Sequence, residues 1–154
     1  PDALLEVWQS LSPVERQSPR LADLAAELLV PLERRNEASR IVEDALAHNW
    51  DARLLRRYPD TAGADALPLI QKAEGWKKDH PEDADLLFAL GRLCQQQQLW
   101  GKAQSFLESA LKLADNEALK VRAHRALARL FEQLGETDKA AKHYRESALA
   151  ITVV

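Results

Sequence analysis

The sequence contains no methionine and a single cysteine among its 154 residues. One cysteine excludes an internal disulfide framework, and the absence of a CxxC pair excludes the usual cysteine zinc sites. A natural translation product starts with methionine, whereas this chain starts with Pro1. We therefore expect the chain to be a piece of a longer protein, with any signal or membrane anchor upstream of it.

Long apolar runs and strand patterns are missing too. No run approaches the roughly 18–20 apolar residues of a membrane span. Sustained alternation of apolar and polar residues is absent and β-branched residues are few, which excludes a sheet. The net charge of −3 gives no sign of a nucleic-acid partner. With 46% hydrophobic and 29% charged residues, the composition is that of an ordinary globular domain.

The strongest pattern present is a unit that occurs twice, at residues 84–113 and 121–150. Each copy has the pattern of two amphipathic helices joined by a turn. The spacing between the copies is close to the period of about 34 residues that is typical of tetratricopeptide (TPR) repeats. Because one helix pair cannot bury its own apolar face, such pairs must stack. The sequence therefore predicts an all-α, right-handed TPR-like solenoid of helical hairpins, with about nine helices.

Small residues at matched positions define where the paired helices touch. Gly91 and Ala103 in the first copy correspond to Ala128 and Ala140 in the second. Helix axes that lie about 8–10 Å apart need small side chains at the contact. We therefore expect all four residues to be buried.

The rest of the chain follows the same plan with weaker matches. We predict a single TPR-like domain over residues 1–154, in which residues 1–18 end a preceding helical unit. In the first repeat Ala26 takes the place of Gly91, and Ser12 with Glu15 resembles a capping box before it. The predicted repeats lie at about 19–50, 51–80 (degenerate), 84–113 and 121–150.

The degenerate repeat has a shortened first helix, because Pro59 and Gly63 interrupt it. We predict a loop over residues 58–64 that buries little and is the interior site most sensitive to proteases. In the helix that follows, we expect Leu67, Ile70 and Ala73 to face inward.

The most specific stretch of the chain is residues 71–113. It contains QKAEGWKKDHPEDADLLFALGRLC followed, after four residues, by LWGKAQSFLESALKL, and WDARLLRRYPD precedes it at residues 50–60. Across nearly its whole length the chain resembles the C-terminal TPR region of HemY-type proteins, bacterial inner-membrane proteins associated with haem biosynthesis. The resemblance implies two membrane-spanning segments upstream and a place at the cell inner membrane, with the cytoplasmic side favoured. It also implies protein partners among the haem-biosynthesis enzymes.

The residues that could bind a metal or catalyse a reaction do not follow any known site motif. His48 and His80 fall at predicted helix ends, whereas His124 and Cys94 fall at core positions. No two histidines are four residues apart, so we predict no metal site. The sequence shows no catalytic triad order and no phosphate-binding loop, and the carboxylates fall on outer helix faces. We therefore predict that the protein is not an enzyme and needs no cofactor.

Arginines recur on the predicted first helices of the two strong repeats, which in a TPR array line the concave, ligand-binding surface. Arg122, Arg125 and Arg129 are spaced as one stripe of a helix, and Arg92 aligns with Arg129. Guanidinium groups suit carboxylates, whether of a peptide or of porphyrin propionates. The alternative is a charged face that only contacts solvent. The full candidate groove comprises Phe88, Arg92, Gln95, Gln96, Arg122, Arg125 and Arg129.

Together these features predict a non-enzymatic scaffold for protein–protein interaction in late haem (porphyrin) biosynthesis at the inner membrane. An alternative function is direct binding and transfer of haem or porphyrin by the concave groove. That alternative requires an axial ligand in an apolar pocket for tight haem binding.

Overall fold

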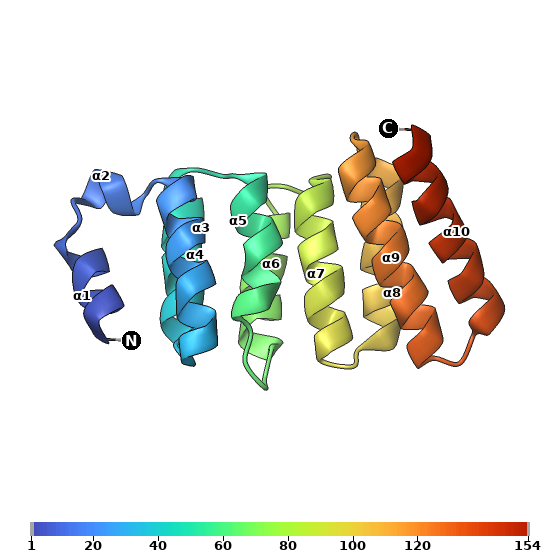
Figure 1. The fold of residues 1–154 in the computed structure, drawn as a ribbon, viewed down its shortest axis with the longest axis horizontal. Coiled ribbons are helices and arrows are strands. Elements are labelled where there is room, and N and C mark those ends of the chain that lie inside the picture. Colours follow the sequence, from blue (N-terminus) through green and yellow to red (C-terminus); the bar gives the residue numbers. More distant parts are fainter. Residues whose placement is uncertain (1, 154) are drawn as a thin grey trace. The chain divides into compact units, whose positions relative to one another are not determined.

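The computed structural model describes residues 2–153, which form ten α-helices, two short 3-10 helices and no strand (Figure 1). This confirms the predicted all-helical, TPR-like class, with ten helices where about nine were expected. None of the helices within residues 2–153 is long and apolar enough to cross a membrane. The elements are α1 Asp2–Ser10, α2 Pro13–Arg16, α3 Pro19–Leu29, η1 Val30–Leu32, α4 Arg35–His48, α5 Ala52–Arg57, η2 Tyr58–Thr61, α6 Leu67–Lys77, α7 Ala84–Gln96, α8 Trp100–Leu113, α9 Glu117–Gln133 and α10 Thr137–Val153.

These helices form two compact units, Pro1–Asp65 and Ala66–Val154. In the first unit α3 packs on α4 and on α5, and η2 packs against α4 and α5. In the second unit α7 pairs with α8 and α9 pairs with α10, while α8 also packs on α9 and α6 packs on α7. The two strong sequence repeats are therefore two stacked helix pairs of the second unit.

Polar side chains define where several helices begin. Ser12 accepts a hydrogen bond from the Glu15 backbone N–H at 3.2 Å, and the Ser12 N–H donates to Glu15 Oε1 at 2.9 Å. This is the predicted capping box, and its backbone hydrogen bond lowers the pKa of Glu15. Ser18, Asp51, Asp83 and Asn116 cap α3, α5, α7 and α9 in a similar way.

The four small residues at the helix contacts are buried, as predicted. Ala103 and Ala128 have no exposed surface, Ala140 is 2% exposed, and Gly91 is buried as well. A Cβ atom on Gly91 would lie 2.6 Å from Leu107 Cδ2 and 3.2 Å from the Leu107 backbone nitrogen. The close approach of α7 and α8 therefore depends on the missing side chain at residue 91.

The first repeat keeps the same register. Ala26 and Ala38, which align with Gly91 and Ala103, are fully buried between α3 and α4. Val42 and Ala45, which align with Leu107 and Ala110, are fully buried too. The weaker sequence match therefore predicted the packing of this helix pair.

The prediction that residues 58–64 bury little is wrong for residues 58–62. Tyr58 is fully buried in η2, and its hydroxyl donates a hydrogen bond to Glu43 Oε2 at 2.5 Å. Arg35 Nη1 donates to the carbonyl oxygens of Asp60 at 2.8 Å and of Ala62 at 3.2 Å. Side chains of α4 thus hold the segment, and in the sequence these residues stand far before it.

Leu67 also departs from its prediction. Ile70 is 3% exposed and Ala73 is fully buried, but Leu67 is 43% exposed. Helix positions three apart rotate by about 60° per step, so Leu67 and Ala73 lie about 120° apart on α6. Two successive steps of three residues therefore rotate a position out of the buried face. The sequence prediction did not take this rotation into account.

We expect Gly91→Ala to lower the free energy of unfolding by about 1–3 kcal/mol, because the new Cβ would overlap the buried Leu107. The matched control is Gly101→Ala on α8, where no atom lies within 4 Å of the added Cβ. The control should leave stability unchanged or raise it by up to about 1 kcal/mol through helix propensity. Urea unfolding followed by circular dichroism measures both. Equal stability of Gly91→Ala and the wild type would contradict this packing.

We expect Arg35→Met to speed tryptic cleavage after Arg56 and Arg57 by roughly tenfold. The variant keeps the apolar stem of the side chain and removes both hydrogen bonds to the segment after α5. Arg40→Met on the exposed face of α4 is the control and should cleave like the wild type. Unchanged cleavage of Arg35→Met would show that the two Arg35 hydrogen bonds do not hold the segment.

Candidate functional site

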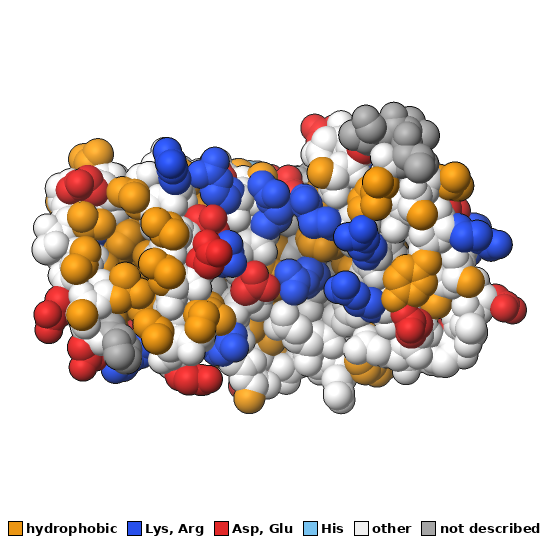
Figure 2. Space-filling model, in the orientation of Figure 1, with side chains coloured by type: hydrophobic (Ala, Val, Ile, Leu, Met, Phe, Trp, Pro, Cys, Tyr) orange, Lys and Arg blue, Asp and Glu red, His pale blue; other side chains and the backbone are white. Residues whose placement is uncertain are grey.

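A cavity of about 260 Å³ opens on the second unit between α7 and α9. We call it the arginine groove. Figure 2 shows basic side chains gathered over these two helices. The groove is lined by Phe88, Arg92, Gln95, Arg122, Arg125, Ala126 and Arg129.

Helix geometry brings the lining residues together. On α9, Arg122, Arg125 and Arg129 follow the i, i+3, i+7 spacing, so their side chains leave one face of the helix. On α7, Phe88, Arg92 and Gln95 follow an equivalent spacing. Because α7 contacts α9, the two faces border the same cavity. Six of the seven predicted groove residues therefore line one cavity.

Gln96 is the predicted residue that does not line the groove. It follows Gln95 on α7 and is exposed. One residue further along the helix is a rotation of about 100°, which turns Gln96 away from the cavity. Gln95 donates a hydrogen bond to Gln133 Oε1 at 3.0 Å. Ala126, which the sequence analysis missed, lines the groove with a side chain too small to fill it.

Arg122 contacts both an aromatic ring and a carboxylate. Its Cζ lies 6.0 Å from the centre of the Phe88 ring, and its Nη2 lies 3.9 Å from Asp85 Oδ1. The side chain of Arg122 is 32% exposed. A partly desolvated guanidinium over an aromatic face is held by a cation–π contact as well as by charge.

Arg125 and Arg129 differ from Arg122, because both are exposed. Within residues 2–153 no carboxylate lies within ion-pair distance of either one. Glu132, an acid on the same helix, instead accepts a hydrogen bond from the Tyr144 hydroxyl, and this bond raises the pKa of Tyr144. The groove therefore keeps positive charge directed to solvent, where an anionic ligand can reach it.

The arginines of the first unit contrast with this arrangement. Arg57 on α5 contacts Asp23 at 2.8 Å, Glu27 at 3.7 Å and Asp60 at 3.6 Å. These carboxylates compensate the guanidinium within the unit itself. The cavity beside them, lined also by Arg53 and Arg56, is thus of mixed charge.

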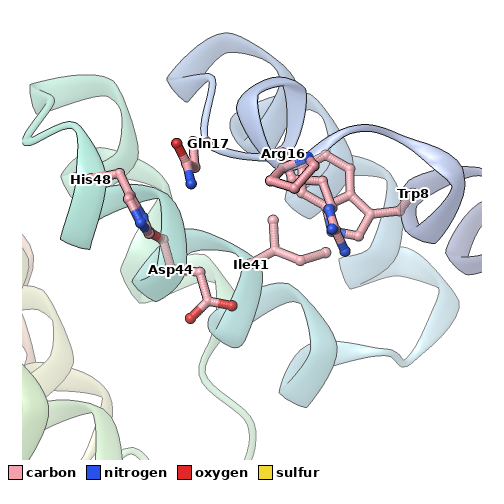
Figure 3. A pocket seen from close by; sticks show the side chains of 7 residues that line it. Trp8, Arg16, Gln17, Ile41, Asp44 and His48 are labelled. Carbon is pink, nitrogen blue, oxygen red and sulfur yellow. The ribbon is translucent and has the colours of Figure 1, made fainter.

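A further cavity of the first unit, of about 210 Å³, is shown in Figure 3. Trp8 of α1, Arg16 of α2 and Ile41, Asp44 and His48 of α4 surround it. The His48 Nδ1–H donates to the Asp44 carbonyl oxygen at 2.9 Å, so this imidazole is hydrogen-bonded to the last turn of α4. With one carboxylate and one guanidinium, the cavity has no dominant charge.

The remaining residues considered for chemistry occupy structural positions. Cys94 is fully buried, and burial raises the pKa of its thiol. His124 is buried at 9% exposure, as predicted, and its Nδ1 lies 3.0 Å from Nδ1 of His143. In the described part of the chain, no three His, Cys, Asp or Glu residues are grouped so that they could hold a metal ion.

Comparisons with known proteins also indicate a fold of repeated helix pairs. Residues 86–148 match the family model "Tetratricopeptide repeat". The structure of MamA 41-end from Desulfovibrio magneticus RS-1 is similar with a TM-score of 0.59 at 17% identity, over 99% of this chain and 85% of that chain. Another crystal structure of MamA gives a TM-score of 0.62 at 12% identity, over 94% of this chain and 85% of that chain. No curated protein sequence matches the chain. At such identities the structural likeness shows the fold alone, and the match to the repeat family covers residues 86–148 of the chain.

Proposed function

We propose that the chain is a non-enzymatic protein-interaction module whose arginine groove binds an acidic segment of a partner protein. The observation that carries this proposal is the convergence of Arg92, Arg122, Arg125 and Arg129 around Phe88 in one cavity. α7 and α9 are the first helices of their pairs, and in TPR arrays these helices present the binding surface.

The charges of the groove favour a carboxylate-bearing ligand. Like charges on neighbouring turns repel one another, and a bound anion would relieve that repulsion. A charge-assisted hydrogen bond contributes about 1.5–3 kcal/mol when it is partly desolvated. Arg125 and Arg129 are exposed, so solvent screens their contacts and each contributes less than that range, about 0–1 kcal/mol. Phe88 is only 5% exposed and adds little apolar surface, so the carboxylates of the acidic segment would supply most of the recognition.

The same residues are poorly suited to catalysis. Guanidinium groups stay protonated at all ordinary pH values, so they cannot act as general acids or bases. Gln95, Phe88 and Ala126 supply neither a nucleophile nor a proton acceptor of suitable pKa. This supports a binding role for the groove.

A more specific form of the proposal rests on the resemblance of residues 71–113 to HemY-type proteins. In that form the acidic partner is an enzyme of late haem biosynthesis, and the module is held at the inner membrane by segments outside this sequence. The alternative is that the groove binds haem or porphyrin directly. The several guanidinium groups of the groove favour it, since a porphyrin offers two propionates.

We expect Arg125→Glu/Arg129→Glu to weaken binding of an oligoglutamate peptide at least about tenfold, because two attractive contacts become repulsive. The relative loss should be larger at low salt than at high salt, since exposed charges are screened by ions. Fluorescence anisotropy of the labelled peptide measures the affinity, and circular dichroism checks that helicity is kept.

The matched control carries the same change of charge on α6 and at its end, as Lys72→Glu/Lys78→Glu. It should bind the peptide within about twofold of the wild type. Equal losses in both variants would indicate a nonspecific effect of net charge and would contradict a defined groove. Titration with haemin and protoporphyrin, followed at the Soret band, separates the two ligand classes. A saturable Soret shift that Arg125→Glu/Arg129→Glu removes would favour the porphyrin alternative.

A further inference from the structure

Two histidines of the last helix pair approach each other through their ring nitrogens, with the rings tilted by 38°. His124 on α9 and His143 on α10 approach with 3.0 Å between their Nδ1 atoms, and their ring centres lie 5.2 Å apart. The His143 ring also stacks on Phe131, at 5.5 Å and an interplanar angle of 13°. His124 is 9% exposed. The pair thus forms part of the contact between α9 and α10.

This contact depends on the number of protons that the pair carries. A hydrogen bond between two Nδ1 atoms needs one nitrogen that donates and one that accepts. Glu146 Oε2 lies 3.5 Å from His124 Nε2, which favours the proton of His124 on Nε2. His143 then donates its Nδ1–H to His124 Nδ1. If both rings are protonated, no acceptor remains and two positive charges face each other.

The preceding helix pair shows what these positions hold without histidine. In the register that aligns Gly91 with Ala128, His124 corresponds to Leu87 on α7 and His143 corresponds to Phe106 on α8. Leu87 is 5% exposed, and neither Leu87 nor Phe106 titrates. The last helix pair therefore carries a titratable contact where its neighbour has apolar side chains.

The charges around the pair come from two helices, α8 and α10. Glu146 on α10 and Glu108 on α8 favour protonation of the imidazoles, whereas Lys142 on α10 opposes it. Lys139 Nζ lies 5.4 Å from the centre of the Phe131 ring on which His143 stacks. Burial is the largest influence and lowers the pKa of both histidines, and His124 lowers the pKa of His143 further.

We propose that the His124–His143 contact makes the docking of α10 on α9 sensitive to acid. α10 stays packed while the pair is neutral and loosens when the pair gains protons. A histidine with a lowered pKa in the folded state binds protons more readily once the contact opens. Stability of the contact is therefore complete above the ordinary histidine pKa of about 6.5 and falls as the pH decreases below it. Each histidine that gains a proton on opening raises the opening constant by up to about tenfold per pH unit.

Hydrogen exchange of the α10 backbone amides tests this proposal in the whole chain. After correction for the intrinsic chemical rate, opening of α10 in the wild type should increase at least about fivefold between pH 7.5 and pH 5.5. His124→Leu/His143→Phe carries the residues of the neighbouring helix pair and should lose this pH dependence. His48→Gln, at the end of α4, is the control and should behave like the wild type. An equal pH dependence in the wild type and the double variant would overturn the proposal.

A second measurement does not depend on the variants. An NMR titration of the imidazole protons in the wild type should give both His124 and His143 a pKa below about 6.5. A pKa at or above that value for both would overturn the proposal, even if the double variant fails to fold. Because α10 contributes no residue to the arginine groove, this outcome is independent of the ligand-binding experiment.

Discussion

The close approach of paired helices at small residues is the constraint on which the other features depend. At Gly91 the α7 backbone lies against Leu107 with no room for a Cβ atom. The same position holds Ala26 in the first helix pair and Ala128 in the last, and both are fully buried. Since the helices can approach only in this register, the contact also determines which side chains remain on the outer faces of α7 and α9.

The arginine groove is one consequence of that register. Once the packing faces of α7 and α9 are turned inward, Arg92 and Arg129 occupy matching positions and line one cavity. In the first unit three arginines of α5 also line one cavity, but Asp23 and Asp60 line it with them and contact Arg57. The same type of helix pair thus supports either an internally compensated surface or one with positive charge directed to solvent. Local carboxylates decide which of the two is formed.

The buried faces of the helix pairs can also hold polar side chains. A helix contact needs side chains of suitable volume, and it does not require that they be apolar if their polar atoms find partners. His124 and His143 meet this condition by bonding to each other, whereas Leu87 and Phe106 occupy the same positions without hydrogen bonds. The repeat architecture can therefore acquire a response to pH at one contact while the neighbouring contacts stay insensitive to it.

The sequence by itself determined the all-helical class, the repeat register and the stripe of arginines on α9, because each depends on spacing along a single helix. Only the tertiary structure decided which side chains from different helices meet. Tyr58 is buried because α4 approaches it, with Glu43 of that helix hydrogen-bonded to its hydroxyl. The two histidines pair although they stand far apart in the sequence. The tertiary structure also decided exposure: Leu24 on α3 is 49% exposed, although it aligns with buried positions of α7 and α9. Periodicity shows which residues share a helix face, but burial depends on what packs against that face.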